Sequence, residues 1–466
     1  MAEEAVVTPD LKLAFNALSG KKALYDTLMQ YAEGDQPIVY STERLRTAFA
    51  NINARFSQNW CSVIVDSVND RLVLQGWDAG DEEKNEVLAT IWSDQHLTIE
   101  SDDAHWSALV THESFIIVWP NEEAEPEVYY NDPRLCHIFY ENANPRKKRF
   151  AAKWFIDDDG FCKLILYYKD RIEYYKCSIT GTPSTYEGFR SDNPASATNP
   201  YDTIPVFHLR VKSRSTAGEL TNVITLQDAV NKLFADMMVA AEYGAFKQRW
   251  IISNSETSDL RNAPNSVWEI PAGDGLGQAT SVGQFEAADL SGFLTAMDKL
   301  ANSMAIISRT PKHYFYSTGS QISGEALIAM EAPLNKKAKT RQESFGVVWK
   351  EIAVFIFKIR GEEISEQDII PIWGSIENVQ PLTQAQSRQL GVQVGIPLLT
   401  LLKREGWTKR DLEQLSKDLE EEQQREQNVP NEWYVDDTAG NKGGDPRSTA
   451  TANGRPAGPN KLDNRS

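Results

Sequence analysis

The chain has 466 residues, of which 41% are hydrophobic, and a formal net charge of −18 from 48 basic and 66 acidic side chains. This length and apolar content allow two or more domains with cores of their own and exclude a chain that is disordered throughout. The acidic excess argues against a protein that grips nucleic acid, because such binding depends on lysine and arginine displacing counterions from phosphates.

The first sixty residues are expected to be helical. Thr8 is placed to cap a helix that has Pro9 at its first position and ends at Gly34. A second helix is expected from about Thr42 to Trp60, because apolar residues recur there at helical spacing.

A sheet is expected next. The stretch NWCSVIVDSVNDRLVLQGW changes from helical spacing to the alternation of a strand. From about His105 to Arg210, aromatic and β-branched residues alternate between turn clusters, which predicts a twisted antiparallel sheet. Within it, Asp157-Asp158-Asp159-Gly160 lacks the ligand spacing of a calcium loop, so we expect a hairpin turn with Gly160 at positive φ.

Two long helices with an insert between them follow the sheet. Thr225-Leu226-Gln227-Asp228 reads as a capping box that opens the first helix, and the second is expected from near Asp289 to Pro311. The insert, residues 249–285, carries strand signals at RWIISN and SVWEIP. Antiparallel helices would bring this insert to one end of the molecule.

A short segment, KHYFYSTGSQI, is expected to be a mobile loop, and a helix from Ser323 to Ile359 follows it. Pro333 removes one backbone donor and is expected to bend this helix without ending it. The apolar positions expected to form its buried stripe are Leu327, Met330, Leu334, Ala338, Phe345, Val348, Ile352, Phe355 and Ile359. The cations expected to stay in water are Lys336, Lys337, Lys339 and Arg341.

The residue patterns assign no catalytic residue, cofactor or metal. Ser19 to Lys22 and Gly273 to Gly277 only imitate a phosphate-binding loop, and both are read as ordinary loops. The spacings of His96, His105 and His112 match no ligand pair, so we expect no metal site. The basic run from Asn144 to Arg149 is read as a solvated turn, with contact to nucleic acid or a partner as the lesser alternative.

The chemistry of the ends and of the cysteines points to an intracellular, soluble protein. The four cysteines make no CxxC pair and the sequence opens on MAEEAVV, so we expect free thiols in a reducing cytoplasm and no signal peptide. Its apolar stretches fall short of the ~18 uninterrupted residues that a membrane span needs.

Three stretches, in this order and spacing, resemble the portal proteins of tailed bacteriophages. They are NWCSVIVDSVNDRLVLQGW, then IPVFHLRVKSRSTAGELTNVITLQDAVNKLFADMMVAAEYGAFKQRWI, then SGEALIAMEAPLNKKAKTRQESF. The resemblance extends to about residue 425. One position departs from it, because His112 stands in ALVTHESF where the family pattern leads us to expect a glycine.

The resemblance implies an α+β portal fold with a mixed α/β wing, a helical stem, a small β-containing clip, a long kinked helix and a helical crown. Its segments would be a wing at 1–219, stem helices at 220–248 and 286–310, a clip at 249–285, a tunnel loop at 311–323, a long kinked wing helix and following strand at 324–380, a crown at 381–427 and a disordered tail at 428–466.

The resemblance implies that the chain forms a ring, expected to be a dodecamer, at one vertex of the capsid. Double-stranded DNA would pass non-specifically through this ring. The implied partners are other copies of the chain, the large terminase subunit, a head-tail adaptor, and the major capsid or scaffolding protein, with no membrane involved. The ring would be assembled in the host bacterial cytoplasm and would not itself be an enzyme.

Candidate site residues follow from this segment order. The loop candidates for facing DNA are Lys312, His313, Ser320 and Gln321, and the candidate for the helix kink is Pro333. The stem-packing candidates are Val230, Leu233, Met237, Phe293, Met297, Leu300 and Met304, and the clip candidates are Trp250, Ile252, Trp268 and Ile270. Two other classes stay open: an adaptor or scaffold that forms dimers or trimers, and an acidic intracellular hydrolase with convergent carboxylates.

Overall fold

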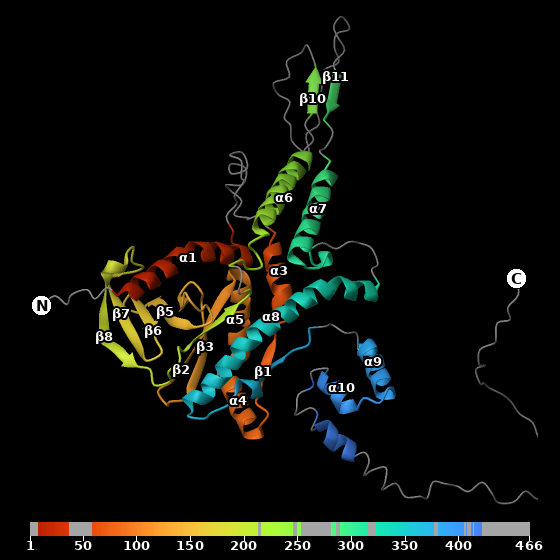
Figure 1. Cartoon of the computed structure of the whole chain (residues 1–466). Helices are drawn as coiled ribbons and strands as arrows, with labels where there is room; N and C mark the ends of the chain where they lie inside the picture. Colours follow the sequence, from red (N-terminus) through yellow and green to blue (C-terminus); the bar gives the residue numbers. More distant parts are fainter. Residues whose placement is uncertain are drawn as a thin grey trace, which may run out of the picture. The chain divides into compact units, whose positions relative to one another are not determined.

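The computed structural model describes residues 8–36, 58–212, 216–245, 249–252, 281–285, 289–315, 323–376, 381–404, 407, 412 and 414–421 (Figure 1). The chain divides into one compact unit up to Leu401 and a second from Leu402 onward. The expected helix at 42–57, most of the expected clip, and the tail from 428 lie outside the described residues.

The first unit contains both helices and strands. The α-helices are α1 (Pro9–Glu33), α3 (Trp60–Asn69), α4 (Glu82–Asp94), α5 (Leu97–Thr111), α6 (Ile224–Ala245), α7 (Ser291–Ser308), α8 (Gly324–Ile359), α9 (Pro381–Gln393) and α10 (Leu398–Arg404), the last of which runs into the second unit. Short 3-10 turns are η1 (Tyr186–Gly188), η2 (Lys312–Tyr314) and η3 (Glu366–Asp368).

Among the described residues, every pairing between two strands is antiparallel, and an isolated parallel bridge joins Phe161 to Gly181. The strands are β1 (Leu74–Asp78), β2 (Glu113–Pro120), β3 (Pro126–Asn131), β4 (Cys136–Tyr140), β5 (Lys148–Ile156), β6 (Phe161–Tyr167), β7 (Arg171–Thr180), β8 (Phe189–Thr198), β9 (Val206–Arg210), β10 (Arg249–Ile252), β11 (Ser281–Gln284) and β12 (Ile370–Trp373). Their sheets have the orders β3-β2-β9, β4-β5-β6-β7-β8, β1-β12 and β10-β11.

The expected single sheet is therefore wrong, because the strands of this region form two sheets that pack against each other. Along β2, Phe115 and Ile117 face a cluster shared with β4, β5 and β7, whereas Ile116 and Val118 face the cluster that contains α5 and α8. This alternation is the two-residue period of a strand that is buried on both faces. A strand of that kind carries no polar face to reveal which sheet it joins.

The five-stranded sheet is covered on its other face by α1. Leu11, Phe15 and Leu18 pack with residues of β5, β6 and β8 in one buried cluster. The predicted start of α1 is confirmed, since the Thr8 hydroxyl accepts a hydrogen bond from the Leu11 amide at 3.2 Å. The predicted end at Gly34 is also confirmed, with φ at 82°.

Several local expectations are settled by these elements. The turn at Gly160 is confirmed, with φ at 83° between β5 and β6. The start of the expected sheet at His105 is wrong, because His105 to Thr111 belong to α5. Over a few residues, the apolar pattern of a helix that is buried on nearly all sides is the same as that of a buried strand. The segment from Ser19 to Lys22 is also helical and not a loop, since it lies within α1.

The ends of the two long helices differ from expectation. The capping box at Thr225 is wrong, because α6 is already helical at Ile224. The Gln227 amide instead donates to the carbonyl oxygen of Gln58 and accepts from the Trp60 amide at 3.0 Å. The second helix, α7, ends at Ser308, and Arg309 follows in the left-handed region with φ at 59°.

The long helix α8 is confirmed from Gly324 to Ile359, with Ser323 capping it and Pro333 inside it. Its buried stripe begins at Leu334, so Met330, which is 38% exposed, does not belong to it. The expectation that Lys337 and Arg341 stay in water is wrong, because both are buried. Each lies three residues from an apolar position of the stripe, which turns it towards the core.

Candidate functional site

Helices α6 and α7 lie side by side, and β10 and β11 extend from the same end of this pair (Figure 1). The predicted stem residues meet in one apolar cluster. Val230, Met297 and Met304 are buried there, and Leu233, Met237 and Leu300 pack against it in part. Phe293 is half-buried and is not a member of that cluster.

The β10–β11 pair places Trp250 directly over Gly283. A Cβ atom at Gly283 would lie 2.4 Å from Cζ2 of the Trp250 ring, so this close approach requires a glycine. Ile252 is 63% exposed and Val282 is 48% exposed, which leaves an apolar surface on the pair. The clip candidates Trp268 and Ile270 lie outside the described residues.

The start of the predicted tunnel loop is a 3-10 turn, η2, that packs against its neighbours. Lys312 Nζ lies 2.8 Å from Asp298 Oδ1 on α7. His313 stacks edge-on against Tyr314, and the Phe315 ring lies 5.8 Å from the Trp60 ring. The loop candidates Ser320 and Gln321 lie outside the described residues.

Arg71 ties this segment to α3 and α8. Its guanidinium donates to the Ser67 carbonyl oxygen at 2.7 Å, to Asn335 Oδ1 at 2.9 Å and to the Tyr314 hydroxyl at 3.1 Å. The Tyr314 hydroxyl in turn donates to Glu331 Oε1 at 3.2 Å. One buried cation thereby joins three elements that are far apart in the sequence.

A second buried charge cluster lies where α8 meets the start of α6 and the end of α7. Glu219 accepts from Lys337 Nζ at 3.0 Å and from Arg341 Nη2 at 2.9 Å. Lys337 also donates to the Ser308 carbonyl oxygen at 2.7 Å, and Arg341 donates to that of Val211 at 2.8 Å. Burial alone would raise the pKa of Glu219, but the charges of Lys337 and Arg341 lower it. We call Glu219, Lys337 and Arg341 the base cluster.

A third buried charge cluster centres on Glu113, where α1 meets the two sheets. Glu113 Oε1 accepts from Lys21 Nζ at 2.9 Å and from the Tyr25 hydroxyl at 2.8 Å, and Glu113 Oε2 lies 2.9 Å from His208 Nε2. Burial would raise the pKa of Glu113, but the neighbouring His137 and His208 and the charge of Lys21 hold it well below its ordinary value. The Lys21 side chain thus serves an internal ion pair.

His112 takes the left-handed conformation, with φ at 78°, at the end of α5. This is the backbone conformation that glycine adopts without strain, which explains why the family pattern leads us to expect a glycine there. The His112 ring is held by Tyr25, whose hydroxyl lies 3.4 Å from its Nδ1 atom.

His105 is fully buried among aromatic rings of the core. Trp349 Nε1 donates to His105 Nε2 at 2.9 Å, so the His105 proton resides on Nδ1 and is donated to the Leu72 carbonyl oxygen at 3.1 Å. Burial lowers the pKa of His105 to about 3. This histidine is therefore a neutral structural group.

The basic run from Asn144 to Arg149 contains the solvated turn that was expected, because Asn144 to Lys147 are all exposed. Lys148 Nζ lies 3.5 Å from Glu351 Oε2 and donates to the Val206 carbonyl oxygen at 3.1 Å. Arg149 pairs with Asp10 at the start of α1. Lys147 pairs with Glu141, and its side chain is 56% exposed.

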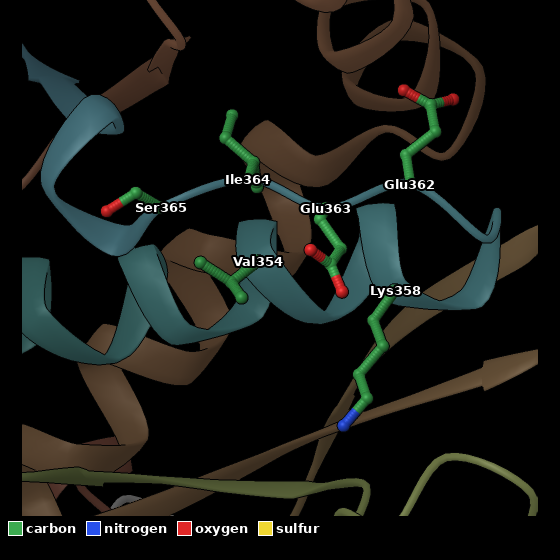
Figure 2. A pocket seen from close by; sticks show the side chains of 6 residues that line it. All are labelled: Val354, Lys358, Glu362, Glu363, Ile364 and Ser365. Carbon is green, nitrogen blue, oxygen red and sulfur yellow. The ribbon is translucent and has the colours of Figure 1, made fainter.

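A shallow pocket of about 460 Å³ lies between the end of α8 and the segment that follows it. It is lined by Val354, Lys358, Glu362, Glu363, Ile364 and Ser365 (Figure 2). The carboxylates of Glu362 and Glu363 point in different directions (Figure 2). Lys358 donates to the Thr203 hydroxyl at 2.9 Å. Polar groups that diverge in this way do not make a catalytic set.

Within the described ranges, no group of three or more His, Cys, Asp or Glu side chains is arranged to hold a metal ion. None of the described helices is long and apolar enough to cross a membrane. All four cysteines are free and buried, which confirms the expectation of free thiols.

The base cluster and the Arg71 contacts were missed by sequence reasoning. One signal was present for the base cluster. Arg341 lies seven residues after Leu334 and four before Phe345, which is the spacing of the buried stripe itself. Glu219 carries no comparable signal, because its partners lie more than a hundred residues away.

Comparison with known proteins gives a consistent family. A family model described as "Phage portal protein, SPP1 Gp6-like" matches residues 15–428. The chain is similar to portal proteins of Mycobacterium phage L5 (24% identity over 322 residues) and Mycobacterium phage D29 (24% over 319 residues). Each alignment covers 63% of this chain, and the chain spans only 63% of the length of each of these relatives.

Among solved structures, the chain is similar to one described as the neck of an empty GTA particle computed with C6 symmetry. The TM-score is 0.43 at 12% identity, and the match covers 77% of this chain and 90% of that one.

Proposed function

This chain belongs to the SPP1 Gp6-like family of phage portal proteins, and from that premise we propose that it forms a ring at one vertex of a bacteriophage capsid. The ring has roughly twelve copies, and double-stranded DNA is packaged and ejected through it. It is assembled in the host bacterial cytoplasm and resides in the virion.

The observation that best supports this proposal is the pairing of α6 with α7 and of β10 with β11 at one end of them (Figure 1). A helix pair of this kind suits a stem, and a small strand pair with an exposed apolar surface suits a clip that joins neighbouring copies. The clip surface includes Ile252, Val282 and Phe285, which are 63%, 48% and 59% exposed.

In this proposal, residues 1–219 and 324–380 form the wing, 220–248 and 286–310 the stem, 249–285 the clip, 311–323 the tunnel loop and 381–427 the crown. The base cluster and Arg71 then lie where the stem, the tunnel loop and the long helix meet. Buried charges that are paired with one another fix one arrangement of such a junction more than they add stability.

The charge of the ring determines how strongly DNA adheres to the channel wall. A ring of twelve copies carries a formal charge of −216 (12 × −18). Most of this charge is screened beyond roughly 10 Å at physiological salt, but an acidic bore still disfavours adhesion of the phosphate backbone. The channel therefore acts as a sleeve, and Lys312 supplies a weak, breakable phosphate contact once it leaves Asp298.

The proposed partners follow from the same arrangement. The clip end binds the large terminase subunit during packaging and the head-tail adaptor afterwards, and the wing contacts the major capsid or scaffolding protein. Hydrolysis of ATP belongs to the terminase, so the role of this chain is structural.

The decisive experiment is negative-stain electron microscopy of the purified chain together with its mass in solution. Twelve copies of 52.4 kDa predict about 629 kDa (12 × 52.4) and rings with a central hole. Stable dimers or trimers would favour the adaptor alternative. A monomer of 52.4 kDa, both alone and with capsid or scaffolding protein, would refute the ring.

The role of Lys312 has its own test in phage assembly. Lys312→Gln is expected to lower the fraction of particles that retain packaged DNA, because it removes the phosphate contact. Lys147→Gln is the matched control, since Lys147 also loses one surface ion pair, with Glu141, but lies in the proposed wing. If both variants retained packaged DNA equally well, Lys312 would not contact DNA in the channel.

A further inference from the structure

The N-terminal end of α8 is a helix without a buried face. Between Gly324 and Pro333 none of the described side chains is buried, and eight of these ten residues are glycine, alanine, leucine, isoleucine, methionine or proline. Ile328 is 48% exposed and Met330 is 38% exposed. A helical end of this length is marginal in water unless something packs against it.

A second apolar surface lies at the C-terminal end of α7. Ile306 is 71% exposed and Ile307 is 49% exposed, although their neighbours Met304 and Ala305 are buried in the core. Because Ile306 and Ile328 are both exposed in the same chain, neither surface covers the other within one copy.

The charges around these two surfaces favour a second copy of this chain as the occupant. Two chains of net charge −18 repel each other over most of their surfaces. Along α7, Asp298 is the sole acidic residue, and Lys312 neutralises it at 2.8 Å. The exposed end of α8 contains two acidic residues, Glu325 and Glu331, and Arg71 neutralises Glu331. These surfaces are therefore places where two acidic copies can approach.

We infer that the exposed end of α8, residues 324–333, packs on Ile306 and Ile307 of an adjacent copy. Each copy then offers one surface and receives the other, and such a head-to-tail contact repeats around a closed ring. This inference rests on the proposed ring and names the residues that would hold neighbouring subunits together at the base of the stem.

The test is chemical cross-linking of the full-length protein with a short bis-maleimide. All four native cysteines are buried, so the parent chain gives a low background. The variant Ile306→Cys/Ile328→Cys is expected to give a ladder of covalent multiples of 52.4 kDa on a denaturing gel. Each single variant is expected to stay monomeric on that gel, because the contact joins two different surfaces.

Leu24→Cys/Ile328→Cys is the matched control, because Leu24 on α1 is 59% exposed but belongs to neither surface. It is expected to give no ladder. Thermal unfolding equal to that of the parent shows that each variant is folded, as expected for substitutions at exposed positions.

The outcomes separate this inference from the proposed function. Rings in the microscope with no ladder from the double variant overturn the contact but leave the portal ring intact. A ladder that stops at dimers overturns the head-to-tail geometry. The absence of both rings and ladder overturns the inference together with the ring on which it rests.

Discussion

Removing the negative charge of the base cluster is predicted to loosen the junction between α8, α6 and α7. In Glu219→Gln, Lys337 and Arg341 keep their charges but lose the carboxylate that lies 3.0 Å and 2.9 Å from them. Their side chains are only 8% and 5% exposed, so water does not replace the lost partner. Breaking a buried ion pair from one side costs about 3–5 kcal/mol.

The assay is native-state hydrogen exchange, because it reports the local opening of this junction separately from the rest of the chain. A cost of about 3–5 kcal/mol corresponds to exchange that is roughly a hundredfold to several thousandfold faster at amides of α8 near Arg341 that open locally. Asp236→Asn is the matched control, because it breaks the exposed Lys232–Asp236 pair, which is worth at most about 0.5 kcal/mol.

An acceleration in Glu219→Gln no greater than that in the control would refute the reasoning. A further variant separates charge from packing. Replacing all three members of the base cluster by apolar residues of similar size removes the unpaired charges, so it should restore most of the protection.

Three further predictions concern single positions. His105→Gln removes a histidine whose pKa is about 3 in the folded state. Because the unfolded chain binds a proton at this histidine below pH 6.5 and the folded chain does not, the parent should lose about 2 kcal/mol more stability between pH 8 and pH 5 than the variant. Equal losses in the two proteins would contradict this assignment. His112→Gly should be more stable than His112→Ala by about 1 kcal/mol in thermal unfolding, because both lose the ring but only glycine adopts φ of 78° without strain. Equal stability of the two variants would show that the backbone at this position is not strained. Gly283→Ala should increase proteolysis of the β10–β11 pair, because its Cβ atom meets the Trp250 ring, whereas Gly292→Ala, which has open space around it, should not; equal proteolysis would show that the close approach is not needed.

The local structure of this chain was largely readable from its sequence. Thr8, Pro9 and Gly34 mark the ends of α1 by rules that involve only neighbouring residues. The left-handed turn at Gly160 and the start of α8 at Ser323 follow in the same way. In each case the determining hydrogen bond or dihedral angle lies within a few residues of the signal, so one sequence is enough to find it.

Reasoning failed where apolar residues occur without a polar face. The pattern from His105 to Thr111 predicts a strand, whereas the structure has a helix there, because a helix that is buried on nearly all sides shows no clear period. The capping box at Thr225 failed because a tertiary contact, from Gln227 to the chain around Trp60, uses the same side chain differently. A short pattern of capping residues does not reveal a competing partner that lies far away in the sequence.

The sequence by itself determined the ends of several helices, the antiparallel pairing of strands, the free thiols and, through the order of its segments, the portal family. Only the tertiary structure decided that β2 is buried between two sheets and that Lys337 and Arg341 point inward to Glu219. The physical reason is the distance in sequence between the residues that interact. Caps and turns are local events, whereas the partner that makes a buried charge tolerable is brought near only when the whole chain folds.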